Sequence, residues 1–130
     1  MADRSADWMA QARRDLLHAK KDVDDGFHEH ACFESHQAAE KAVKAVYQRL
    51  HGEAWGHRVS HLLAEIRPRL EIPEELVDDA KLLDQYYIPT RYPNGFESGA
   101  PADYYTRAQA ADASERATRI IDWCAGVLGT

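Results

Sequence analysis

Apolar residues recur at steps of three and four along most of this chain. In the first segment the stripe consists of Trp8, Ala12, Leu16, Ala19 and Val23. This spacing places side chains on one face of an α-helix, whereas a half-buried strand needs alternation. The sequence contains no alternating stretch, internal repeat or low-complexity tract. It therefore predicts an all-α fold, and its 130 residues suit a single domain over positions 1–130.

Cap and turn signals divide the pattern into helical segments. The first predicted helix has an N-cap at Asp3 or Ser5 and stops at Gly26, and the second covers 29–51. The third covers 58–70 with a break near Pro68. The fourth is opened by Pro73, and the fifth by a capping box at 106–109. The fourth stripe is Leu76, Ala80, Leu83 and Tyr87. Because most of the connections are short, we expect an up-and-down bundle of four or five helices.

Charge and composition narrow the classes of function. The net charge of −6 argues against broad, sequence-blind binding of nucleic acid, which needs a basic surface. Cys32 and Cys124 lie in helix-like apolar patterns and are too far apart in sequence for a typical metal pair, so we expect reduced core residues. The sequence has neither a signal-peptide pattern at its start nor the ~20 apolar residues that span a bilayer. A cytoplasmic protein without a membrane contact is expected.

The most distinctive stretch is 86–94, with the sequence Tyr-Tyr-Ile-Pro-Thr-Arg-Tyr-Pro-Asn. Its first proline should end the preceding helix, and residues 93–95 should form a turn. A guanidinium among aromatic rings can hold a phosphate through two hydrogen bonds, and the rings can stack on a base. In the structural alternative, Tyr86 and Tyr87 complete a core face while Arg91 caps a helix or pairs with an acid.

Histidines and other reactive residues give no firm site. His57 and His61 are one helical turn apart, but they lack the Glu of the His-Glu-x-x-His metalloprotease motif. His28, His30 and His36 cluster near a helix start, where histidines are commonly surface residues. There is no glycine-rich phosphate loop and no Gly-x-Ser-x-Gly elbow. We therefore expect no metal site, no cofactor and no catalytic residue.

Five features of the sequence point to one family. They are the opening Trp8, Ala12 and Asp15-Leu16, the run His-Gln-Ala-Ala-Glu-Lys-Ala-Val-Lys-Ala over 36–45, Gly56-His57 ahead of Leu62-Leu63, Tyr87 with Arg91-Tyr92-Pro93-Asn94, and Ile120-Ile121-Asp122-Trp123. Together they resemble the HEPN domain, named for nucleotide binding in higher eukaryotes and prokaryotes, in its small stand-alone prokaryotic form. The resemblance covers nearly the whole chain.

The resemblance implies a fold, an assembly and two functions. It implies two long antiparallel helices and a homodimer built on helices. Some family members act beside a minimal nucleotidyltransferase and bind a nucleotide. Others are metal-independent ribonucleases, often the toxin of a toxin–antitoxin pair, with an Arg-x4–6-His pattern. After Arg91 the corresponding positions hold Phe96, Glu97 and Ser98. Arg13 and His18 have the spacing but lie on the regular first helix.

We therefore expect a non-catalytic protein that binds a nucleotide such as ATP, or a nucleotide-bearing partner. The residues expected to bind nucleotide or phosphate are Arg91, Tyr92, Asn94, Tyr87, Lys41, Lys44 and His57. Arg91 would contact the phosphate, with Tyr87 and Tyr92 orienting it. Lys41 and Lys44 would add charge if the second helix passes beneath the loop. The alternatives are a ribonuclease acting on RNA and a purely structural module for dimerisation and docking.

Overall fold

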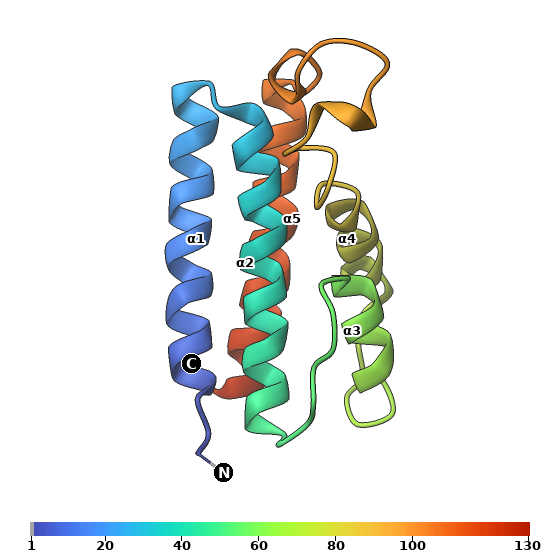
Figure 1. Ribbon diagram of the computed structural model, residues 1–130. Coiled ribbons are helices and arrows are strands. Elements are labelled where there is room, and N and C mark those ends of the chain that lie inside the picture. Colours follow the sequence, from blue (N-terminus) through green and yellow to red (C-terminus); the bar gives the residue numbers. More distant parts are fainter. Residues whose placement is uncertain (1) are drawn as a thin grey trace.

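The protein is a bundle of five α-helices, described over residues 2–130 by a computed structural model (Figure 1). The helices are α1 (Ser5–Asp25), α2 (His28–Arg49), α3 (Val59–Ile66), α4 (Glu74–Asp84) and α5 (Arg107–Leu128), with 3-10 turns η1 (Pro93–Gly95) and η2 (Pro101–Asp103). No strand occurs within the described residues, so the predicted all-α fold is confirmed. Within the same range, none of the helices has the length and hydrophobicity needed to cross a bilayer.

Three long helices, α1, α2 and α5, form the body of the bundle (Figure 1). α1 and α2 are an antiparallel hairpin closed at Gly26, whose φ of 87° is the left-handed conformation that glycine favours. Arg49, at the end of α2, donates to Asp3 Oδ2 and to the carbonyl of Leu128, each at 3.0 Å. The start of α1 and the ends of α2 and α5 therefore meet at one pole of the molecule.

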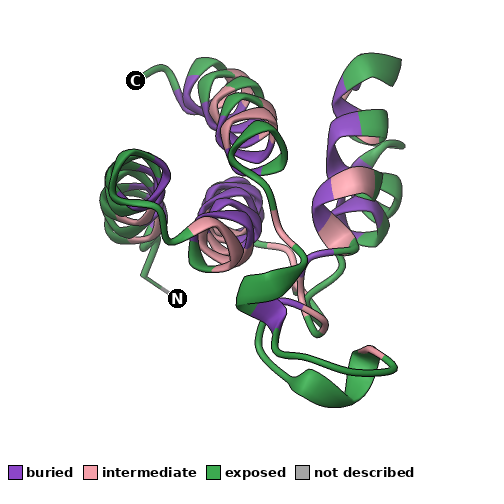
Figure 2. Cartoon of the chain, turned by 90° about the horizontal axis from the view of Figure 1, so that it is seen from above, coloured by how far each residue is buried: buried purple, intermediate pink, exposed green. Residues whose placement is uncertain are grey.

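The shorter helices α3 and α4 lie on the side of α2 that is opposite α1 (Figure 2). The linker 50–58 runs back along the bundle, so that α3 begins beside the middle of α2 (Figure 1). The chain then reverses into α4, and a long connection carrying η1 and η2 leads to α5. This route brings the linker, the end of α4 and the middle of α2 together.

The core is built around α2, which is buried along most of its length between the other helices (Figure 2). Its fully buried small residues are Ala31, Cys32, Ser35, Ala38, Ala39, Ala42 and Ala45. Small side chains let neighbouring helices approach closely. Cys32 and Cys124 are both buried and free, and burial raises the pKa of the Cys32 thiol to about 12. Both cysteines are therefore core residues, as expected.

α3 ends at Ile66, which confirms the predicted break before Pro68. The end of α4 differs from the sequence prediction, because α4 ends at Asp84 and does not continue to Tyr87. The chain after α4 tightens into a 3-10-type turn in which the Tyr86 amide donates to the Leu83 carbonyl at 2.9 Å. The tighter turn rotates the following side chains, so the buried tyrosine is Tyr86, and the prediction that Tyr87 continues the core stripe was wrong.

The start of α1 also differs in detail. Arg4 occupies the N-cap position and makes no side-chain capping bond, while the Asp3 carboxylate accepts a hydrogen bond from the Ser5 amide at 2.8 Å. Trp8 is only partly buried, and Met9 fills the core position beside it. The last helix begins as predicted, since Thr106 and Gln109 form a complete capping box.

Ion pairs join the helices at two levels. Between α1 and α2, His18 contacts Glu34 through Nδ1 and lies 3.5 Å from Asp22 through Nε2. Between α4 and α5, the buried carboxylate of Asp79 accepts from Arg116 at 3.0 Å and from Arg119 at 2.8 Å. The contacts of Asp79 with the two arginines hold α4 against α5, and they thereby position the segment that follows α4.

Replacing Asp79 with Ala should lower the free energy of unfolding by about 1–3 kcal/mol, because three charge-assisted hydrogen bonds to a buried carboxylate are lost, one from Arg116 and two from Arg119. The loss stays moderate because both arginines are partly exposed and can be hydrated. Chemical denaturation would measure it. Asp78→Asn is the matched control, since the Asp78 side chain is exposed, and it should change stability by less than about 0.5 kcal/mol. Equal stability of the two variants would contradict a structural role for Asp79.

Candidate functional site

Tyr87 lies where the segment after α4 meets α2 and the linker before α3. Its ring centroid is 4.9 Å from that of His57, with the planes nearly parallel at 19°, and 5.1 Å from that of His36. Phe33 of α2 lies 6.1 Å away, and the guanidinium carbon of Arg91 lies 4.6 Å from the ring. We call Phe33, His36, His57, Tyr87, Arg91 and Tyr92 the Tyr87 cluster.

The guanidinium of Arg91 is exposed and surrounded by aromatic rings. Its carbon lies 4.5 Å from the Phe33 centroid and 5.2 Å from that of Tyr92, in addition to the Tyr87 contact. Its Nε donates to the Tyr87 carbonyl at 2.8 Å, which fixes the side chain at the end of a helical turn. Within residues 2–130 no carboxylate lies within 4.0 Å of Arg91. The two Nη groups therefore point an unneutralised charge at the surface.

His57 is held by a buried carboxylate. Its Nδ1 lies 3.1 Å from Glu40 Oε1, and Glu40 Oε2 accepts from Lys44 at 2.9 Å. A carboxylate at Nδ1 fixes the tautomer, so Nε2 of this half-exposed ring remains free to accept or donate a proton. Lys44 is thus linked to the cluster through Glu40. Lys41 instead pairs with Asp15 of α1, so the structure does not bring it to the cluster.

Two residues that were not assigned to the site from sequence hold this arrangement together. One is His36, whose expected place among surface histidines was wrong because its ring is fully buried, and the other is Asp84. The fully buried His36 donates from Nε2 to the His57 carbonyl at 2.9 Å and lies 3.3 Å from Asp84 Oδ1. Asp84 accepts from the amides of Val59 at 2.7 Å and Ser60 at 3.1 Å, which caps the start of α3. Burial alone would raise the pKa of Asp84, but hydrogen bonds from His36, Ser60 and Val59 hold it below its usual value.

The segment after Arg91 and the linker before His57 carry further exposed residues. Tyr92 is 48% exposed, and Asn94 lies in η1, which confirms the predicted turn at 93–95. Trp55, two residues before His57 in the linker, is 72% exposed. The later part of the loop contains η2 and a stacked pair of Phe96 and Tyr104 rings at 4.1 Å.

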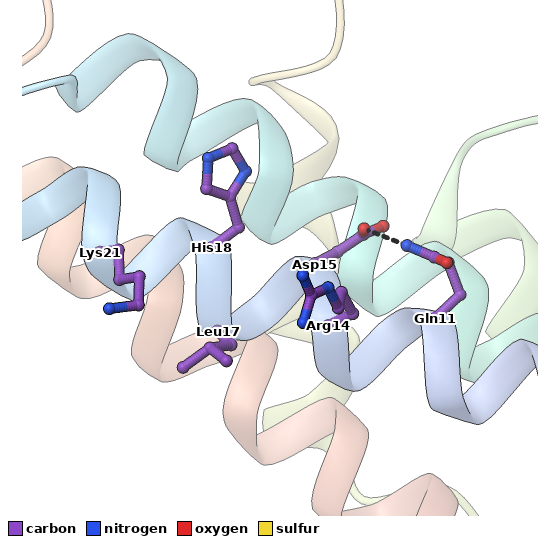
Figure 3. Close-up of a pocket in the computed structure, with 6 residues that line it drawn as sticks. All are labelled: Gln11, Arg14, Asp15, Leu17, His18 and Lys21. Carbon is purple, nitrogen blue, oxygen red and sulfur yellow. Dashed lines mark hydrogen bonds between the residues drawn. The ribbon is translucent and has the colours of Figure 1, made fainter.

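The cluster presents a surface rather than a well-formed cavity. Five hollows on the surface of residues 2–130 are lined by neither Arg91 nor Tyr87. One of these five, of about 420 Å³, lies on α1 (Figure 3). Small-molecule sites are usually concave. The Tyr87 cluster therefore suits a ligand that lies across an exposed guanidinium, or one that a second protein helps to enclose.

The structure brings together Arg91, Tyr87, Tyr92 and His57 of the residues expected from sequence. The supporting residues were missed, although one signal was available. His36 and Glu40 are four apart on a helix and therefore lie on one face of α2. A buried histidine and a buried carboxylate on one helix face indicate a polar contact with another element.

Comparisons with known proteins agree with this fold. The HEPN domain model matches residues 5–127. The structure of TT1696 from Thermus thermophilus is 40% identical with a TM-score of 0.94, covering 97% of this chain and 99% of that one. ST0689, an archaeal HEPN homologue, is 41% identical with a TM-score of 0.82 and coverages of 96% and 98%. An HEPN domain protein from Thermotoga maritima, tm0613, is 44% identical with a TM-score of 0.78 and coverages of 94% and 97%. No curated protein matches the chain.

Replacing Asp84 with Ala should lower the free energy of unfolding by about 1–2 kcal/mol, because the first amides of α3 lose their cap. The folded-state pKa of Asp84 is lowered, so its stabilising contribution is present above the unfolded pKa of about 3.9 and is lost as the pH falls through the folded value. The difference between wild type and variant should therefore shrink in acid. Urea denaturation from pH 7 to pH 3 would measure this, with the exposed Asp122→Ala as control. A difference that stays constant with pH would contradict the capping role.

Proposed function

We propose that this chain, which belongs to the HEPN domain family, binds a nucleotide or a nucleotide-bearing partner at the Tyr87 cluster without catalysing a reaction. One observation carries the proposal: the Arg91 guanidinium is exposed, packed on aromatic rings and free of any carboxylate partner within residues 2–130. Because only Nε is used internally, the Nη groups can donate to two oxygens of one phosphate.

Exposed aromatic rings near Arg91 and His57 offer surfaces on which the base of a nucleotide could stack. Tyr92, adjacent to Arg91, and Trp55, in the linker beside His57, both leave much of their rings open. Stacking of a base on an aromatic side chain contributes about 1–3 kcal/mol and depends little on which base it is. The phosphate would therefore set the position of the ligand, and the rings would favour a nucleotide over inorganic phosphate.

A second protein would complete the open surface. Ile88, next to the cluster, and Tyr92, within it, are 51% and 48% exposed. The proposal therefore includes a homodimer and a minimal nucleotidyltransferase partner, as the family resemblance implies, either of which could cover these side chains. A structural docking role without nucleotide is the corresponding alternative.

Cleavage of RNA is a second candidate function, favoured by the Glu40–His57 pair. The Arg-x4–6-His pattern is missing after Arg91, yet His57 of another segment contacts the same tyrosine ring as Arg91, at 4.9 Å and 4.6 Å. An imidazole whose Nδ1 is held by a carboxylate and whose Nε2 is open to solvent has the geometry of a general acid or base. With Arg91 on the phosphate, such a pair has the parts for metal-independent cleavage.

Thermal-shift measurements with nucleotides test the main proposal. A ligand at one hundred times its dissociation constant stabilises the native state by about 2.7 kcal/mol, which raises the melting temperature by several degrees. AMP and ATP, with and without magnesium, should stabilise the wild type but not Arg91→Ala. Adenosine, which lacks phosphate, should have little effect. Arg69→Ala is the matched control, since it removes an exposed arginine from another part of the chain. Equal shifts in wild type and Arg91→Ala would reject the proposed site.

Incubation of labelled RNA with the protein in EDTA distinguishes the ribonuclease function from the non-catalytic proposal. The non-catalytic proposal expects intact RNA. Cleavage that is lost in His57→Gln and retained in His61→Gln would reject the non-catalytic proposal in favour of a ribonuclease. His61→Gln is the control, because His61 pairs with Glu65 and is not in the cluster. Cleavage that persists in His57→Gln would point to a contaminating nuclease.

A further inference from the structure

The outer face of α1 carries four exposed cations that make no ion pair within the described residues. They are Arg13, Arg14, Lys20 and Lys21. Elsewhere on the bundle, arginines such as Arg116 and lysines such as Lys44 are neutralised by neighbouring carboxylates. Four unpaired cations within nine residues are unexpected in a chain of net charge −6. This concentration of positive charge indicates an acidic partner.

The cations form two rows with an apolar residue between them. Arg13 and Lys20 are seven residues apart, as are Arg14 and Lys21, so each row spans two helical turns or roughly 10 Å. Leu17 lies between the rows, and Ala10 and Ala6 continue the same side of α1 toward its N-terminus, beyond Arg13. Leu17 is 52% exposed, one of the larger apolar side chains left open on the surface. An apolar centre flanked by charges is the pattern of a helix–helix contact surface.

Surface hollows lie on both sides of this apolar strip. One, of about 420 Å³, is lined by Leu17, Arg14 and Lys21 together with their α1 neighbours (Figure 3). The other, of about 270 Å³, is lined by Ala6, Ala10 and Arg13 where α1 meets the end of α5. Side chains of a partner helix could enter both hollows while its backbone approaches the alanines.

We propose that the outer face of α1 binds an acidic amphipathic helix of another protein. Its apolar side would cover Leu17, Ala10 and Ala6, and its carboxylates would pair with the two cation rows. The central apolar contact at Leu17 would supply most of the affinity, while the charges set the orientation and the rate of association.

A second copy of the chain and a nucleic acid fit this face less well. A two-fold contact across Leu17 would bring Arg13 and Arg14 of one copy against Lys20 and Lys21 of the other, and like charges oppose such an interface. A polynucleotide could pair with the cations but has no apolar side chain for Leu17. The face also has no aromatic ring between its rows on which a base could stack.

This proposal is independent of nucleotide binding. α1 and the α3–α4 pair lie on opposite sides of α2 (Figure 2), so the proposed surface shares no residue with the Tyr87 cluster. Either proposal can fail while the other stands.

Fluorescence anisotropy with a designed peptide tests the proposal. The probe is a labelled helix of about three heptads with Leu and Ala on one side and Glu on both flanks. A scrambled peptide of the same composition and an oligouridylate are compared at about 0.15 M salt. We expect the wild type to bind the amphipathic peptide about tenfold more tightly than the scrambled one, a difference of about 1.4 kcal/mol. Arg14→Glu with Lys21→Glu, and separately Leu17→Gln, should each remove most of that preference.

The control variant, Arg69→Glu with Lys81→Glu, makes the same change of charge at exposed positions away from α1 and should bind the peptide as the wild type does. Circular dichroism would confirm that all variants remain helical. Equal binding of both peptides, tighter binding of oligouridylate, no binding of the amphipathic peptide, or an equal loss in the control variant would each overturn the proposal.

Discussion

The carboxylate of Asp84 is the contact on which the candidate site depends. Asp84 is the last residue of α4. Its carboxylate caps α3 by accepting from the amides of Val59 and Ser60, and it lies beside the buried His36 of α2. Three segments that are distant in sequence are thereby fixed to one another. Tyr87 follows three residues later, so its position against His57 is a consequence of where α4 ends and of what its last carboxylate binds.

α2 serves both the core and the site. Its alanines allow the other helices to pack closely, while Phe33, His36 and Glu40 lie toward the linker and the segment after α4. A buried histidine and a buried carboxylate are costly unless each finds a partner. Here they find the linker carbonyl, Asp84, Lys44 and His57, so that the same contacts that satisfy the buried groups also orient the exposed imidazole.

Much of the fold could be predicted from periodicity and caps, because the buried face of a helix is visible in the spacing of its apolar residues. The family could be predicted from the Gln-Ala-Ala-Glu-Lys-Ala and Arg-Tyr-Pro-Asn runs, and it is confirmed. The contacts of the site could not be predicted in the same way. From spacing along the chain, Tyr87 was predicted to continue the fourth helix, but α4 ends at Asp84. Lys41 was likewise predicted to belong to the site, whereas it pairs with Asp15.

The same reason explains why His57 was difficult to place. A search for histidine after Arg91 follows one segment, whereas the structure brings an imidazole to Tyr87 from a different segment. Such a contact depends on the path of the linker and on the hydrogen bond from His36, and neither leaves a periodic signal. The features that sequence reading missed are therefore polar contacts between elements.

The most direct test of the central claim is an NMR titration of side-chain signals with AMP and with adenosine. The account predicts that the Arg91 Nε–H and the Tyr92 and His57 ring signals shift saturably with AMP, and that adenosine shifts the Arg91 signal little. Shifts confined to the α1 cations, or none near Tyr87 at millimolar AMP, would contradict a phosphate site at Arg91.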